Sequence, residues 1–187
     1  NTLNGDSNGA FFDALVAADL LRLPILSFSV PEDGMKAWGG GRFRQHFVAW
    51  SYFHSLPEAS NRDFIKAYQS RFGADQYVTD PAVASYVGVL LWAQTVKEVG
   101  TADPQWTNGS SLLRQSVAGP DGVAAVDART RHLWKRLLIG RVQADGQFTQ
   151  LFTSQDLMRP SPWPVYRPCG MASLARADAA MKLSGIL

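Results

Sequence analysis

The sequence is poor in the residues that form cross-links and metal centres. Its 187 residues include a single cysteine, Cys169, and three histidines, His46, His54 and His132. One cysteine can form neither an intrachain disulfide nor a cysteine-based metal site. The histidines lie far apart in the chain, without the close spacing of metal-binding motifs, so we expect no metal and no cofactor.

Runs of like charge and long apolar runs are also missing. The 18 basic and 16 acidic side chains give a formal net charge of +2. The densest basic stretch comprises Arg129, Arg131, Lys135, Arg136 and Arg141. Hydrophobic residues interrupt it, and it lacks the interleaved aromatic residues of a nucleic-acid-binding face, so we expect no nucleic-acid partner. No signal peptide and no membrane-spanning run is visible in the sequence.

Catalytic motifs are missing around the candidate nucleophiles. Ser27, Ser29 and Ser55 lie outside any Gly-x-Ser-x-Gly sequence, the motif that surrounds the nucleophile of many hydrolases. Gly39-Gly40-Gly41 lacks the strand–helix context of a phosphate-binding loop. Asp6 and Glu32 form an acid–base pair only if their two loops meet. We therefore expect a binding protein rather than an enzyme.

The composition that remains is that of an ordinary globular protein, with 46% hydrophobic and 18% charged residues. Apolar residues at helical spacing predict a helix from Asn8 to about Leu21. The apolar run 23–30, ended by Pro31, predicts a buried strand of a parallel sheet. Residues 31–37 favour a short helix that begins at Pro31, and residues 46–52 predict a second strand.

Paired helices are predicted in the middle of the chain. Ser60 or Asn61 caps a helix that closes at Gly73, and Pro81 opens the longest helix, which stops at Gly100. A polar loop over 101–108 precedes a further predicted helix over 110–117. A turn at 119–122 and a hairpin ribbon over 139–153, with Asp145-Gly146 at its tip, complete an α/β pattern.

Two loops have the form of the ligand-binding loops of open α/β sheets, which follow the carboxyl ends of strands and precede helices. A small neutral polar ligand needs hydrogen-bond donors, acceptors and flat apolar walls. The residues predicted to supply them are Asn4, Asp6, Ser7, Phe28, Ser29, Glu32 and Tyr52.

Several of these residues also have a purely structural explanation. Asp6 and Ser7 are ordinary helix-capping residues, and Glu32 complements a helix dipole. Phe28 alternates with Leu26 and fits a hydrophobic core. The sequence leaves these alternatives open.

Six segments, in their order and spacing over residues 1 to about 165, resemble one known family. They are Asn1-Thr-Leu-Asn-Gly-Asp-Ser-Asn8, Pro24–Val30 with Glu32, Ala49–Ser55, Asp80-Pro81 with Ala84, Tyr86 and Leu91-Trp92, Asp127–Ile139 with His132-Leu-Trp134, and the ribbon with its Arg159-Pro160 exit. The sequence resembles the urea and short-chain-amide binding proteins of ABC transporters, within the leucine/isoleucine/valine-type periplasmic binding proteins.

The resemblance implies a two-lobed type I periplasmic binding protein with parallel-sheet lobes, flanking helices and a C-terminal β ribbon. Residues 1–53 would belong to the second lobe, 54–138 to the first lobe, and 139–165 to the ribbon and hinge return, with a tail over 166–187. The hinge would lie near residues 47–55 and 139–153. The first half of the family's chain, with its export signal and most polar ligand contacts, would be missing here and would be a partner of this chain.

The function that the resemblance implies is periplasmic capture of urea or a short-chain amide for the membrane permease of an ABC transporter. An amide-sensing regulatory protein of the same fold, in the cytoplasm, is one alternative. A branched-chain amino acid binding protein is the other. The tail departs from the family pattern; residues 173–187 favour a short helix, and we expect it to lie away from the cleft.

Overall fold

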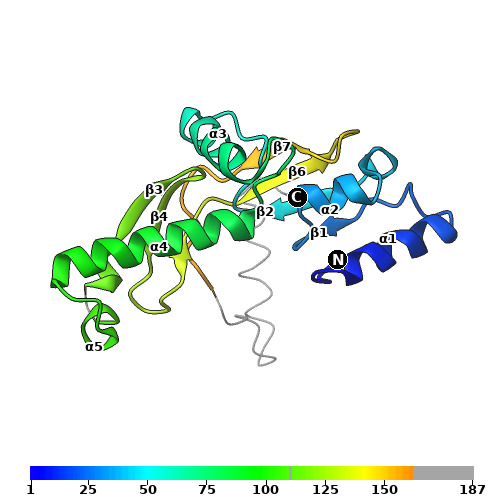
Figure 1. The fold of residues 1–187 in the computed structure, drawn as a ribbon. Coiled ribbons are helices and arrows are strands. Elements are labelled where there is room, and N and C mark those ends of the chain that lie inside the picture. The colour runs from blue at the N-terminus through cyan, green and yellow to red at the C-terminus, as the bar shows by residue number, and fades with distance from the viewer. Residues whose placement is uncertain (110, 162–187) are drawn as a thin grey trace, which may run out of the picture.

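Two β-sheets with packed helices make up the described part of the chain, residues 1–109 and 111–161 of a computed structural model (Figure 1). The helices are α1 Ser7–Ala17, α2 Glu32–Ala37, α3 Ala59–Phe72, α4 Asp80–Val99 and α5 Pro104–Thr107, with 3-10 turns η1 Gly40–Phe43 and η2 Leu112–Arg114. The strands are β1 Leu26–Ser27, β2 Phe47–Trp50, β3 Ser116–Gly119, β4 Gly122–Val126, β5 Leu133–Trp134, β6 Leu138–Val142 and β7 Phe148–Thr153. This confirms the predicted α/β class.

The first sheet has the order β1-β2-β6-β7 and joins the two ends of the described chain. β1 pairs with β2 in parallel, Leu26 opposite Phe47, whereas β6 pairs antiparallel with both β2 and β7. The expectation of a parallel sheet is therefore correct for one pair only. The sheet is mixed because β6 runs antiparallel to β2, and the short hairpin connection makes β7 antiparallel to β6.

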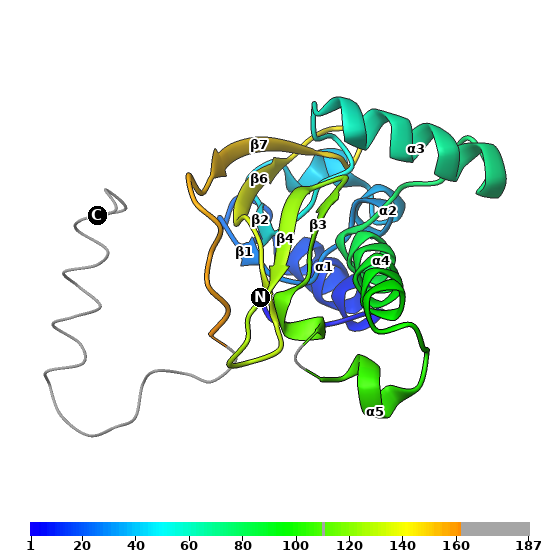
Figure 2. The ribbon, with the colours of Figure 1, turned by 90° about the vertical axis from the view of Figure 1, so that its left-hand side faces the viewer.

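The second sheet, β3-β4-β5, is an antiparallel meander that follows α4. The helix predicted over 110–117 is wrong: residues 112–114 form η2, and Ser116–Gly119 form β3, in register with β4 from Ser116↔Ala125 to Gly119↔Gly122. Pairing with β4 outweighs the local helical preference of this stretch. Figure 2 shows the β3–β4 hairpin beside α4, where a β-carbon at Gly119 would lie 2.9 Å from Val87.

Helix boundaries follow local capping chemistry where that chemistry is strong. α4 has Pro81 in its first turn and ends at Gly100, which has a left-handed φ of +75°. α5 was missed inside the predicted polar loop, although the Asp103 side chain caps it by accepting from the Gln105 N–H at 2.9 Å. None of the described helices is long and apolar enough to cross a membrane.

Residues 18–30 are less regular than predicted. α1 ends at Ala17, four residues before Leu21, and the strand predicted over 23–30 is reduced to Leu26–Ser27. Leu20 and Leu23 are exposed by 46% and 50%. The helix expected over 173–187 lies outside the described residues.

The tip of the β6–β7 hairpin is packed against the backbone of the N-terminal elements. A β-carbon at Gly146 would lie 2.6 Å from the Lys36 nitrogen of α2, and one at Gly40 of η1 would lie 2.6 Å from the Gly146 Cα. The Asp145-Gly146 turn forms as predicted, with the Gln143 N–H donating to the Gln147 carbonyl at 2.8 Å. The ribbon is thereby held to the segment between α2 and η1.

Candidate functional site

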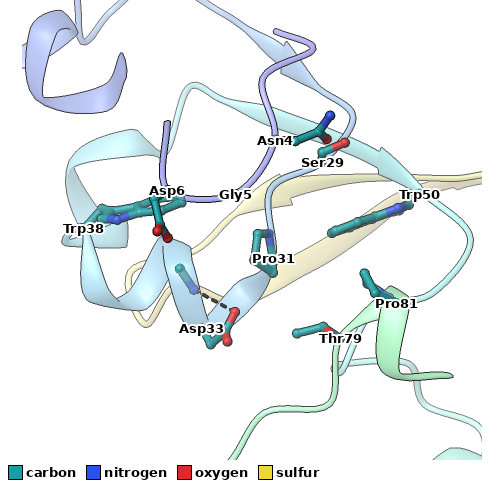
Figure 3. Close-up of a pocket in the computed structure, with 11 residues that line it drawn as sticks. Asn4, Gly5, Asp6, Ser29, Pro31, Asp33, Trp38, Trp50, Thr79 and Pro81 are labelled. Atoms are coloured by element: carbon teal, nitrogen blue, oxygen red, sulfur yellow. Dashed lines mark hydrogen bonds between the residues drawn. The ribbon is translucent and has the colours of Figure 1, made fainter. Parts of the chain in front are cut away.

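A cavity of about 440 Å³ lies where the loop before α1 and the loop after β1 meet the start of α4 (Figure 3). Its walls come from three parts of the chain: the α1 entry loop, the segment from Ser29 to Trp38, and the pair formed by the end of β2 and the start of α4. The lining residues are Asn4, Gly5, Asp6, Ser29, Pro31, Asp33, Gly34, Trp38, Trp50, Thr79 and Pro81.

Three of the seven predicted ligand-binding residues, Asn4, Asp6 and Ser29, lie in this lining. The two loops singled out from the sequence therefore do meet. A role in ligand binding remains a prediction for each of them.

The other four predicted residues do not line the cavity. Ser7 is exposed on the first turn of α1, and the Phe28 side chain is 48% exposed. Tyr52 and Glu32 are fully buried. The Tyr52 hydroxyl donates to the Asn61 Oδ1 at 2.7 Å, and the Glu32 Oε1 accepts from the His54 N–H at 2.7 Å. Both residues are engaged in the interior because their segments turn inward at these positions.

Polar groups in the cavity are free to bind a ligand. Among the described residues, the side chains of Asn4, Asp6, Ser29 and Thr79 make no hydrogen bond to one another or to the surrounding chain. Asp6 and Thr79 occupy the N-cap positions of α1 and α4 without making a side-chain cap. Neither side chain is used in capping its own helix, so both are open to water or to a ligand.

Two tryptophans form the flat apolar walls of the cavity. Trp38 stacks on Phe12 with ring centroids 5.6 Å apart. Its indole also lies against the backbone of two helices, since a β-carbon at Gly34 would lie 2.9 Å from Trp38 and one at Gly9 would lie 3.0 Å from it. Figure 3 shows Trp50 across the cavity from Trp38, beside Pro81. The position of Trp38 therefore depends on the lack of side chains at Gly9 and Gly34.

Glu32 lies behind the cavity wall and carries a perturbed carboxyl group. Burial raises the pKa of Glu32 from 4.5 to about 8, against the lowering effect of the backbone hydrogen bond from His54. Its second oxygen, Oε2, has no hydrogen-bond partner among the described residues. The carboxyl group is therefore mostly neutral at pH 7.

Most of the apolar lining and one motif lie outside the residues predicted from the sequence. Trp38, Trp50 and Thr79 follow no pattern that distinguishes them from core or capping residues. Residues 5–9 read Gly-Asp-Ser-Asn-Gly, a Gly-x-Ser-x-Gly sequence around Ser7. This is not a nucleophile elbow, because Ser7 is helical and no described histidine contacts it.

Comparison with known proteins assigns the family. Residues 1–169 match the family described as periplasmic binding protein domain, which covers most of the chain, and the chain belongs to this family. Its fold is that of the type I periplasmic binding proteins, as the sequence resemblance implied.

Solved structures agree with this fold at low sequence identity. An amino acid ABC transporter substrate-binding protein from Pseudomonas fluorescens Pf-5 is 20% identical, with a TM-score of 0.68, over 84% of this chain and 43% of that chain. A solute-binding protein of an ABC transporter from R. palustris, solved in complex with benzoate, is 18% identical, with a TM-score of 0.69, over 84% of this chain and 43% of that chain. The chain thus spans less than half the length of these solved relatives.

One curated relative is more distant in length. A limonene hydroxylase from Geobacillus stearothermophilus is 24% identical over 117 residues, which is 63% of this chain and 21% of that protein. Because the match covers one fifth of that protein, the hydroxylase activity in its name is not assigned to this chain.

Proposed function

We propose that this chain forms one side of the ligand cleft of an ABC-transporter solute-binding protein whose ligand is small, neutral and rich in N–H groups, with urea or a short-chain amide first. Membership of the periplasmic binding protein family implies an extracytoplasmic location and delivery of the ligand to a membrane permease. The same proposal assigns residues 1–53 to the second lobe, residues 54–138 to the first lobe, and residues 139–165 to the ribbon and hinge return.

The charge of the cavity lining carries the proposal. Asp6 and Asp33 line it, and none of the eleven lining residues, all within the described chain, is Lys, Arg or His. Carboxylates accept from N–H groups and repel anions. The indoles of Trp38 and Trp50 suit a flat ligand such as an amide. This lining disfavours the benzoate carried by one structural relative, and it offers a branched-chain amino acid a partner for its ammonium but no cation for its carboxylate.

The proposal predicts which ligand perturbs the cavity. Titration of the chain with acetamide, followed by NMR, should shift the indole N–H signals of Trp38 and Trp50. The signals of Trp92 and Trp106, which are 49% and 64% exposed outside the cavity, serve as internal controls. Because only one side of a cleft is present, the expected dissociation constant is roughly millimolar or weaker. If benzoate or leucine shifts the Trp38 and Trp50 signals and acetamide does not, the proposed ligand class is wrong. If acetamide binds with a micromolar dissociation constant, the chain forms more than one side of a cleft.

The two loop residues in the cavity should contribute directly to binding. Removing a hydrogen-bonding partner of a neutral ligand costs roughly 1–3 kcal/mol, which weakens binding about tenfold to a hundredfold. We expect this loss of acetamide affinity for Asp6→Ala and for Ser29→Ala, with the fold unchanged by circular dichroism. Ser7→Ala is the matched control, since Ser7 adjoins Asp6 but lies outside the lining. Equal affinity of all three variants and the parent chain would remove these loops from the site.

A further inference from the structure

The dipeptide Asn-Gly occurs three times in the chain, at residues 4–5, 8–9 and 108–109. In this dipeptide the glycine nitrogen can attack the asparagine side-chain carbonyl, because glycine has no β-carbon to hinder the approach. The attack needs an asparagine side chain that is not held in place and a glycine N–H that is not hydrogen-bonded. The fold gives the three dipeptides different surroundings.

The first dipeptide, Asn4-Gly5, meets both conditions. Both residues are exposed in the loop before α1. Among the described residues, neither the Asn4 side chain nor the Gly5 N–H forms a hydrogen bond. A β-carbon at Gly5 would meet nothing within 4 Å, so the space around the reacting atoms is open. This asparagine also lines the ligand cavity (Figure 3).

The second dipeptide, Asn8-Gly9, meets neither condition. The Asn8 side chain is fully buried, and its Nδ2 donates to the carbonyls of Leu3 and Ser29 at 3.0 and 3.2 Å. The Gly9 N–H donates to the Asp6 carbonyl at 3.0 Å. The same chemical pair is therefore protected only four residues further along the chain.

The third dipeptide lies away from the cavity. Asn108 is exposed after α5, and the Gly109 N–H donates to the Trp106 carbonyl at 3.3 Å. Neither residue of this dipeptide lines the cavity. A change of charge at Asn108 is therefore a control for the same change at Asn4.

We propose that Asn4 is a self-modification site of the ligand cavity, where spontaneous deamidation replaces a side-chain amide by a carboxylate. The Gly5 nitrogen bonds to the Asn4 Cγ, the Cγ–Nδ2 bond breaks, and the proton of the Gly5 N–H leaves with the amide as ammonia. Water then opens the cyclic imide at either carbonyl, which gives aspartate or isoaspartate. The sum is one water consumed and one ammonia released, with no other reagent.

The product alters the hydrogen bonding and the charge of the cavity. An amide offers N–H donors, whereas a carboxylate only accepts. With Asp6 and Asp33, the new carboxylate would be the third in a lining that has no Lys, Arg or His. The carbonyl oxygen of a neutral amide would lose a donor and meet negative charge instead. The effect on acetamide affinity rests on the proposed function, whereas the reaction itself does not.

The reaction is tested by incubation of the 187-residue chain at pH 8.5, followed by trypsin digestion and tandem mass spectrometry. The first tryptic peptide, residues 1–22, contains both Asn4 and Asn8, so one spectrum compares them. In the folded chain Asn8 should convert at least about tenfold more slowly than Asn4, because it must first open from its buried site. In guanidinium chloride the two should convert at similar rates, since both precede glycine. Asn4→Gln keeps an amide and should remove the fast reaction.

The effect on the cavity is read from Asn4→Asp, with Asn108→Asp as the matched control. The indole N–H signals of Trp38 and Trp50 should shift in Asn4→Asp and stay in place in Asn108→Asp. Acetamide should bind Asn4→Asp about tenfold more weakly than the parent chain and bind Asn108→Asp equally well.

The outcomes separate this site from the proposed function. If the folded chain keeps the amide of Asn4 as long as that of Asn8, the proposal is overturned. It is also overturned if Asn4 converts but Asn4→Asp leaves both indole signals unchanged, since the reaction then does not act on the cavity. If Asn4 converts and the indole signals shift, but acetamide does not bind the parent chain, the modification site stands and only the ligand assignment fails.

Discussion

Replacement of Gly146 by alanine is expected to destabilise the chain by about 3 kcal/mol. This is the largest loss of stability that we expect from the addition of one methyl group. Gly146 has a φ of +86°, which alone costs an alanine roughly 1–2 kcal/mol. Its β-carbon would also lie 2.6 Å from the nitrogen and 2.7 Å from the Cα of Lys36. These are backbone atoms, so relief of the overlap requires the hairpin tip to move away from α2. Unfolding in guanidinium chloride measures the loss.

Gly88 offers a matched control for this substitution. It lies within α4, and a β-carbon there would meet nothing within 4 Å. Gly88→Ala should therefore stabilise the chain by roughly 0.5–1 kcal/mol, because alanine loses less backbone entropy in a helix. Similar stability of the Gly146→Ala and Gly88→Ala chains would show that the hairpin tip is not docked against α2.

The second large effect concerns the pH dependence of stability at Glu32. The pKa of Glu32 is raised from 4.5 to about 8 by burial, so folding binds a proton between these values. Stability should therefore fall as the pH rises from 4.5 to 8, by on the order of 1 kcal/mol per pH unit, and level off above 8. Glu32→Gln should lack this decline and be the more stable chain at pH 8.5.

At pH 5 the order of the two chains is expected to reverse or to vanish. Both side chains are then neutral, and the glutamine amide brings an additional N–H group into a site where the Glu32 Oε2 already lacks a partner. Guanidinium chloride is the appropriate denaturant, since urea is the proposed ligand. A parent chain with constant stability between pH 5 and 8 would contradict the buried, neutral carboxyl group. Glu98→Gln, which removes an exposed carboxylate bonded to Arg114, should follow the parent at every pH.

Local chemistry is what made parts of this fold predictable. Pro81 and Gly100 delimit α4, and Asp145-Gly146 places the tip of the ribbon, because each acts through its own backbone conformation. The same reasoning from local chemistry gives the wrong prediction for residues 116–119, which form β3. Its helical preference was weak, and the hydrogen bonds that form β3 come from residues 122–125, which lie beyond any local pattern.

The candidate site divides in the same way. Asn4, Asp6 and Ser29 could be found because each is a polar residue in a loop directly before a helix, where the ligand-binding loops of α/β sheets lie. Glu32 has the same sequence signature, yet it lies behind the wall and bonds to His54. Only the packing of residues 51–54 against α2 distinguishes Glu32 from the three residues that line the cavity.

The sequence by itself determined the periplasmic binding protein family and the α/β class, because these depend on the order of segments and on local turn and cap residues. That the two N-terminal loops meet was left open by the sequence and was decided by the tertiary structure. Tertiary structure alone decided that Trp38 and Trp50 face one cavity, that Thr79 joins it from α4, and that the Glu32 carboxyl is buried and neutral. Burial and ring position are set by contacts between residues far apart in the chain, and the glycines at positions 9 and 34 matter only once Trp38 lies against them.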